Sequence, residues 1–251
     1  MSKTTKIMLI LFIPLMLLFS ASPANAMHIS EGILPFKWAV LWFAASAPFL
    51  MWGLRDLRIR SGETPQYKIL VGMVGAAVFI ISCMPIPVPF AGTCSHPCGT
   101  GLAAIIIGPS VTVVITSIAL IFQALFLAHG GLSTLGADIF SMGVAGAFAG
   151  YGLFKLCLHL KVPFLAAAFM AGIFSDWATY TITSLELSSA LHTSGSFAAM
   201  FIAILVAFMP TQIPLGVFEG FMCAGAYKFI AVRRPDLLEN GKKINALEAA
   251  E

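Results

Sequence analysis

The feature that most constrains this sequence is a series of long apolar runs separated by short loops that carry Lys and Arg. The first run extends from Ile33 to Leu54 and ends at a basic cluster, Arg55, Arg58 and Arg60. A helix needs about 20 apolar residues to cross the hydrocarbon core of a bilayer. The composition agrees, because 59% of the residues are hydrophobic and only 10% are charged, whereas a soluble domain carries about 25% charged residues. The sequence therefore predicts an all-α integral membrane protein, a polytopic helical bundle.

The first 26 residues have the pattern of a secretory signal peptide. Lys3 and Lys6 precede an apolar run from Ile7 to Phe19, and the small-x-small triplet Ala24-Asn25-Ala26 follows. We therefore predict a signal peptide over residues 1–26, cleaved after Ala26, and one transmembrane domain over residues 27–251. The mature length leaves room for several spans but not for an added soluble domain.

The distribution of positive charge predicts about seven transmembrane helices after removal of the signal peptide. An exported N-terminus and a basic, cytoplasmic C-terminus require an odd number of spans, whereas six apolar runs are obvious. One run must therefore cross twice. A break at Gly108-Pro109 leaves a first piece of about ten residues, which is short for a span. A break of the last run at Pro210 or Pro214 leaves Lys155 and Lys161 on the exported side, so both alternatives stay open.

Cleavage after Ala26 would turn Met27 into a free α-amine. That amine, the backbone nitrogen of His28 and the imidazole Nδ1 of His28 can close two fused chelate rings on one ion. Nitrogen-rich, near-planar ligation suits Ni²⁺, Co²⁺ and Cu²⁺ better than Ca²⁺ or Mg²⁺. The spacing also fits a histidine placed there by chance, so this interpretation needs support from the rest of the chain.

A second histidine lies on the same predicted side of the membrane. The prolines of segment 85–89 end the second apolar run, because proline lacks the amide donor and clashes with the preceding helical turn. The loop over residues 92–99 is therefore predicted to be non-helical and exported. It carries His96, which is available as a further ligand to an ion held by Met27 and His28.

Two cysteines, Cys94 and Cys98, bracket His96. A Cys-x-His-x-Cys cluster can form a soft-metal site or a disulfide, and the sequence leaves both alternatives open.

Carboxylates within or next to apolar runs are functional candidates, because a charge inside a membrane is costly. They are Asp138, Asp176, Glu186 and Glu219. We place Glu186 in a polar loop together with His192, and interpret His129 and His192 as loop residues rather than ligands. Glu219 is expected to pair with a basic group or a helix end.

Three segments resemble the CbiM/NikM family, the substrate-binding subunits of energy-coupling-factor transporters for cobalt and nickel. They are Met27–Gly32, Pro87–Pro109 (PVPFAGTCSHPCGTGLAAIIIGP) and His129–Met142 (HGGLSTLGADIFSM). The resemblance implies that the ion is held by the amine of Met27, the nitrogens of His28 and the imidazole of His96. Glu31, Ser95 and Asp138 lie in or beside these segments and are candidates for the hydrogen bonds that hold such ligands in place. The sequence departs from the family pattern at His129, where an acidic residue is common, and at Asp138 and Ser141, where Asn is usual.

The same resemblance implies partners and a location. The chain has no G-x-x-x-x-G-K-[ST] motif for ATP, so one or more ATPase subunits and a coupling transmembrane subunit must be separate chains, with a small accessory membrane subunit as an optional further partner. The expected location is the bacterial or archaeal cytoplasmic membrane, with the mature N-terminus exported. Co²⁺, for cobalamin biosynthesis, or Ni²⁺ is the expected substrate, without an organic cofactor, and the sequence does not separate the two ions.

Two other classes of function remain for comparison. A stand-alone metal permease driven by an ion gradient should have ionisable residues in the middle of several spans, and these are scarce in the sequence. An enzyme is not expected, because H-E-x-x-H and recognisable nucleophile dyads are absent. The net charge of +3 lies in short clusters between apolar runs and gives no sign of nucleic-acid binding.

Overall fold

The computed structural model describes residue 29 and residues 31–64, 66–84, 86–88, 93–127, 129–192 and 196–238. The predicted signal peptide and the candidate ligands Met27 and His28 lie outside these ranges. The predicted division at residue 26 therefore stays a prediction.

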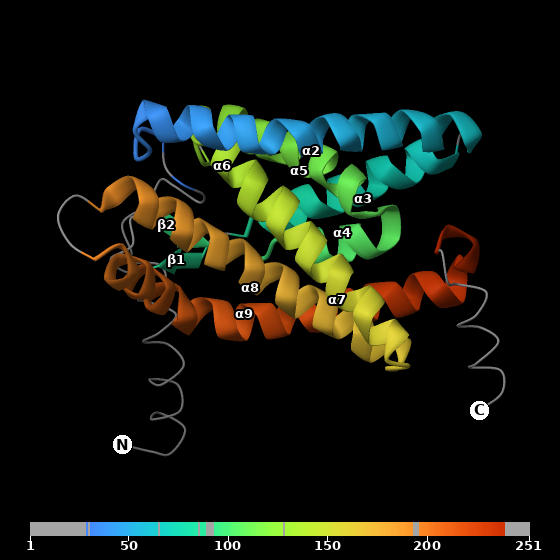
Figure 1. The fold of residues 1–251 in the computed structure, drawn as a ribbon. Helices are drawn as coiled ribbons and strands as arrows, with labels where there is room; N and C mark the ends of the chain where they lie inside the picture. Colours follow the sequence, from blue (N-terminus) through green and yellow to red (C-terminus); the bar gives the residue numbers. More distant parts are fainter. Residues whose placement is uncertain are drawn as a thin grey trace, which may run out of the picture.

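Helices make up most of the described chain (Figure 1). They are α2 (Phe36–Glu63), α3 (Gln66–Ser82), α4 (Thr100–Ile107), α5 (Pro109–Phe126), α6 (Leu135–Asp138), α7 (Ala147–His159), α8 (Phe164–Leu191) and α9 (Phe197–Arg233). A π-helical segment, η1 (Ile139–Gly146), joins α6 to α7, and a short 3-10 helix, η2 (Pro235–Leu237), follows α9. Proline marks several helix starts, because its fixed φ angle suits the first turn. Pro35 and Pro163 directly precede α2 and α8, and Pro109 is the first residue of α5.

Length and composition qualify three helical segments within the described ranges for crossing a membrane: Pro109–Phe126, Leu135–His159 and Phe197–Arg233. Large apolar side chains such as Phe36, Phe126 and Phe221 are exposed on the outside of the bundle. The interior, by contrast, holds many buried Ser, Thr and carboxylate side chains. This inside-out distribution is the one expected of a bundle that faces lipid.

The helix breaks at Gly108-Pro109, where α4 ends at Ile107 and α5 begins at Pro109. The α2–α3 connection, the α4–α5 break and the end of α9 lie at one end of the bundle, on the right of Figure 1. Arg60 Nη1 and the Tyr67 hydroxyl both donate to the carbonyl oxygen of Ile107, at 2.9 and 2.8 Å, which ties the end of α4 to the basic α2–α3 corner.

The alternative break in the last apolar run is wrong, because α9 continues through Pro210 and Pro214 without interruption. Contacts with a neighbouring helix help a membrane helix to tolerate proline. Here the indole nitrogen of Trp177 on α8 donates to the carbonyl oxygen of Gln212, at 3.0 Å, between the two prolines.

A two-stranded antiparallel hairpin corrects the all-α prediction. Strand β1 (Ile86–Val88) pairs with β2 (Thr93–Ser95), with Ile86 opposite Ser95 and Val88 opposite Thr93. Alternate prolines prevent a helix here, and the extended backbone that they leave finds its hydrogen bonds across the hairpin. The hairpin packs against α9 and delivers the chain to the loop that contains His96.

Small residues of the segment 135–159 let it pack closely against its neighbours in the bundle. A Cβ atom on Gly136 would lie 2.5 Å from the backbone nitrogen of Phe43 on α2, and one on Gly150 would lie 2.8 Å from the carbonyl oxygen of Ala171 on α8. Only glycine permits helix backbones to approach this closely.

Candidate metal centre

His96 lies in the interior of the bundle, in the loop between β2 and α4, and is only 2% exposed. The hydroxyl of Tyr180 on α8 bonds to both backbone polar groups of His96. The backbone N–H of His96 donates to the Tyr180 hydroxyl at 2.8 Å, and the hydroxyl donates to the His96 carbonyl oxygen at 3.1 Å. The loop that sequence reasoning placed on the exported side is thus anchored within the helices.

The imidazole of His96 has the tautomer and the neutral charge that metal binding requires. Its Nδ1 lies 3.0 Å from the carbonyl oxygen of Pro97. A carbonyl oxygen only accepts hydrogen bonds, so the ring proton belongs on Nδ1 and the lone pair on Nε2. Burial lowers the pKa of His96 from 6.5 to about 4, which keeps the ring neutral at pH 7, and neutral imidazole is the metal-binding form.

His129 lies beside His96, a proximity that sequence reasoning missed. The two ring centroids are 6.0 Å apart in an edge-to-face arrangement, and His129 is also 2% exposed. Burial and the neighbouring His96 lower the pKa of His129 to about 3, so both rings are neutral. His129 is a loop residue, as predicted, but the loop after α5 folds inward. The sequence does contain a signal for this position, because His129 begins the third segment that resembles the CbiM/NikM family.

The chain directly after His28 is clamped against the start of α6. The backbone N–H of Ile29 donates to Asp138 Oδ1 at 3.2 Å, and the Thr134 hydroxyl donates to the carbonyl oxygen of Ile29 at 2.7 Å. Thr134 Oγ1 also lies 3.3 Å from Asp138 Oδ2. Ile29 is completely buried. Asp138, a predicted supporting residue, therefore holds the backbone of Ile29, which follows the predicted ligand His28 in the sequence.

Glu31 also holds the N-terminal segment. Its Oε2 accepts the backbone N–H of Ser133 at 3.1 Å, and hydrogen bonds from Ser133 lower the pKa of the exposed carboxyl group. A Cβ atom on Gly131 would lie 2.7 Å from the backbone Cα atom of Glu31, so this close approach requires glycine at that position. Glu31 thereby ties the segment after Ile29 to the loop over residues 130–134.

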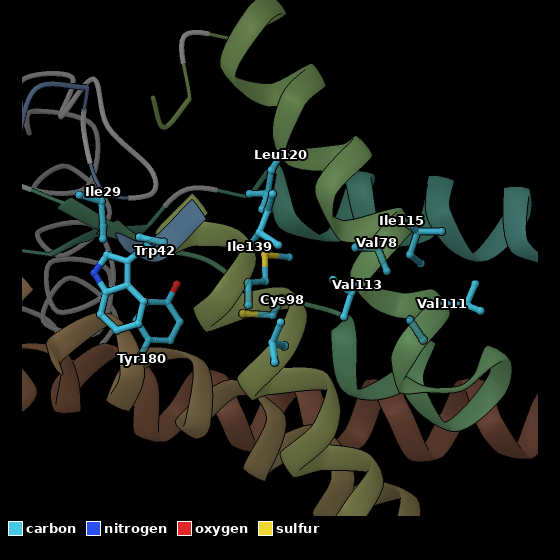
Figure 2. Packing of buried hydrophobic residues seen from close by; sticks show 14 of the residues in the cluster. Ile29, Trp42, Val78, Cys98, Val111, Val113, Ile115, Leu120, Ile139 and Tyr180 are labelled. Atoms are coloured by element: carbon cyan, nitrogen blue, oxygen red, sulfur yellow. The ribbon is translucent and has the colours of Figure 1, made fainter. Parts of the chain in front are cut away.

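Ser95, the third predicted supporting residue, is completely buried and hydrogen-bonds to Gln212 on α9. Because Ser95 precedes His96, this bond also holds the loop in place. Tyr180 and Ile29 belong to one buried apolar cluster, which also includes Trp42 (Figure 2). The cluster thus connects the His96 loop with the clamped N-terminal segment.

Two further sequence expectations can be compared with the structure. Placing Glu186 in a polar loop was wrong, since α8 continues to Leu191 and Glu186 is completely buried within it. The expectation that Glu219 pairs with a helix end is confirmed, because its carboxylate accepts the backbone N–H groups of Cys98 and Gly99 at the start of α4. Cys98 is a free thiol, which excludes the disulfide alternative for this residue.

Comparison with known proteins assigns the chain to a family. Residues 28–237 match the model of CbiM, described as the cobalt uptake substrate-specific transmembrane region. The chain belongs to the CbiM family. The resemblance found in the sequence is thereby confirmed, and together with the apolar helices it identifies a helical integral membrane protein.

Individual relatives agree with this assignment. The chain is 61% identical over 218 residues to the cobalt transport protein CbiM of Geobacter sulfurreducens, covering 87% of this chain but only 63% of that protein. It is 55% identical to the CbiM of Sorangium cellulosum, covering 85% of this chain and 95% of that protein. A crystal structure of a truncated transition metal transporter superposes with a TM-score of 0.72 at 26% identity, covering 81% of this chain and 98% of the other.

Proposed function

We propose that this CbiM-family chain is the substrate-capture subunit of an ATP-driven energy-coupling-factor transporter that imports Co²⁺, with Ni²⁺ as a second ion that the same ligands accept. The observation that carries the proposal is the clamp on Ile29. Asp138 accepts the backbone N–H of Ile29, and Thr134 donates to the Ile29 carbonyl oxygen. The backbone of the residue that follows the proposed ligand His28 in the sequence is thus held at both of its polar groups.

The ligand set consists of the Met27 amine, the backbone nitrogen and Nδ1 of His28, and Nε2 of His96. Four nitrogens suit Co²⁺ and Ni²⁺ and disfavour Ca²⁺ and Mg²⁺. The neutral imidazole of His96 in its anchored loop supports this choice. The relatives are called cobalt transport proteins, which favours cobalt, for cobalamin biosynthesis, over nickel.

The topology that goes with this function has seven crossings, an exported N-terminus and a cytoplasmic C-terminus in a bacterial or archaeal inner membrane. Its support is the position of the α4–α5 break at the same end as the basic α2–α3 corner. Helix α4 alone, eight residues long, rises only about 12 Å, so the loop that contains His96 begins in the interior. With the break there, Lys155 and Lys161 fall on the cytoplasmic side, as the charge rule prefers.

A gradient-driven permease remains as a second candidate because of one observation. Four carboxylates, Asp138, Asp176, Glu186 and Glu219, are at most 4% exposed and lie on three helical segments. Ionisable groups inside a bundle are what a proton-coupled pathway uses. From the sequence alone, ionisable residues inside the spans were judged scarce, in part because Glu186 was placed in a loop.

Uptake of Co²⁺ in a cobalt-transport-deficient host separates the two functions. We expect uptake when this chain is expressed together with its ATPase and coupling subunits, and none when the ATPase carries a substitution in its P-loop lysine. Uptake by this chain alone that a protonophore abolishes would contradict the proposal and support the permease.

The clamp on Ile29 gives a prediction of its own. Asp138→Ala should weaken Co²⁺ binding by about 10 to 100-fold, because the residue orients a ligand without binding the ion. Asp138→Asn is the matched control, since its amide oxygen can accept the same N–H of Ile29, and it should bind nearly as tightly as the wild type. Isothermal titration of the purified mature proteins measures both. Equal affinities for the Ala and wild-type proteins would contradict a role for the clamp.

A further inference from the structure

A second group of metal-ligating atoms lies inward of the His96 loop. It consists of the Cys98 thiol, before α4, and the carboxylates of Asp176 on α8 and Glu219 on α9. One ligand atom from each residue lies within 4.8 Å of the other two, and all three side chains are buried. Figure 2 shows Cys98 within the buried cluster of the bundle. Neither the proposed chelate nor the family resemblance uses these three side chains.

The surroundings of the two carboxylates leave their charge unbalanced. Glu219 accepts the backbone N–H groups of Cys98 and Gly99, and Asp176 Oδ1 lies 3.9 Å from the Cys98 sulfur. These neighbours include no basic side chain. Two carboxylates this close in a water-poor interior cannot both remain ionised unless a cation or a shared proton lies between them. A metal ion between the carboxylates would supply that positive charge.

Gln212 holds the Asp176 carboxylate in the cluster. Gln212 is 4% exposed, and its side-chain amide lies between Asp176 and Ser95. With the amide nitrogen directed at Asp176, it donates to the two carboxylate oxygens at 2.9 and 3.2 Å, while the amide oxygen accepts the Ser95 hydroxyl. Hydrogen bonds of this kind hold metal-ligating carboxylates in position.

We propose that Cys98, Asp176 and Glu219 form an inner binding site for a divalent transition metal ion. One sulfur and several oxygens suit tetrahedral Co²⁺ or Zn²⁺, while the thiolate disfavours Mg²⁺ and Ca²⁺. Cys98 follows His96 by two residues, and its sulfur lies 4.0 Å from the His96 carbonyl oxygen. An ion that leaves the imidazole thus has a further set of ligands directly inward of it. This site does not depend on the N-terminal amine.

Titration of the purified mature protein with CoCl₂ tests the inner site. Bound cobalt per chain is measured by elemental analysis after desalting, and the thiolate-to-cobalt charge-transfer band is followed in the near ultraviolet. We expect two Co²⁺ ions per chain and a band in the wild type. Cys98→Ser should retain one ion and lose the band. Asp176→Asn, which keeps the side-chain volume, should also retain one ion. Cys157→Ser, at a buried cysteine on α7, is the matched control and should keep both ions and the band.

Two outcomes would overturn the proposal: a wild-type protein without the band, or a band that survives in Cys98→Ser and so comes from another thiol. His96→Ala separates the two sites, since it should remove one ion and leave the band. A wild-type protein that binds a single ion and shows the band would support the inner site while contradicting the N-terminal chelate. The two proposals can therefore fail separately.

Discussion

Protein that keeps residues 1–26 attached is expected to lose high-affinity Co²⁺ binding, although every proposed ligand side chain is present. In the precursor the nitrogen of Met27 belongs to a peptide bond with Ala26, so it cannot serve as an amine ligand. Ala26→Asp should block cleavage, because signal peptidase requires a small residue at this position. Cobalt uptake by the intact transporter should then fall to the background of cells without the chain. N-terminal sequencing of the purified protein verifies that the signal peptide is retained.

An insertion tests the same chelate in cleaved protein. One glycine between Met27 and His28 keeps the amine and both histidines but enlarges the chelate by one peptide unit. The extra backbone nitrogen would complete four nitrogen ligands without His96, so the proposed geometry is lost and uptake should fail. A glycine inserted after Glu239 is the matched control and should transport normally. Normal uptake by uncleaved protein would refute the amine ligand, even though the family assignment would stand.

The sequence predicted the helices well because local signals control them. The apolar runs locate them along the chain, and prolines set several of their starts, as at Pro35, Pro109 and Pro163. The hairpin was missed because the prolines of segment 85–89 exclude a helix without specifying a partner strand. The continuity of α9 depends on tertiary contacts, including the hydrogen bond from Trp177 on α8, which periodicity does not reveal.

Glu186 shows why polar residues near a run end were misread. The neighbouring Ser and Thr residues resemble a loop in composition, but in α8 their hydroxyls bond back into the helix. Thr183 and Ser184 donate to the carbonyl oxygens of Thr179 and Tyr180 at 3.0 and 2.7 Å. A hydroxyl satisfied in this way can be buried within a helix. Polar composition therefore did not mark the end of the span.

The candidate site was predictable only in part. The proposed chelate could be derived from the sequence, because cleavage after Ala26 places a free amine directly before His28. The contacts that would support it join residues far apart in the chain, such as Ile29 with Asp138 and His96 with Tyr180. No local pattern specifies such pairs, because they arise from the packing of α6 and α8 around two loops. The inward position of His129 was missed for the same reason.

His96→Ala is expected to abolish high-affinity capture of Co²⁺ at the N-terminal chelate while leaving membrane insertion intact. The substitution removes one of four nitrogen ligands, and it leaves the hydrogen bonds of the His96 peptide group with Tyr180, because those bonds involve only backbone atoms of residue 96. The loop should therefore keep its path, so that the loss reports ligation rather than misfolding.

Two other histidines provide the comparison. His192→Ala, at the end of α8, removes an imidazole whose Nδ1 contacts the carbonyl oxygen of Ser188 in its own helix, and should transport normally. His129→Ala removes the ring beside His96 without removing a proposed ligand, and should weaken uptake less than His96→Ala does. Uptake and bound metal in the three variants, compared at equal membrane expression, decide the assignment. Wild-type uptake by His96→Ala, or a larger loss of uptake in His129→Ala, would show that His96 is not the fourth ligand.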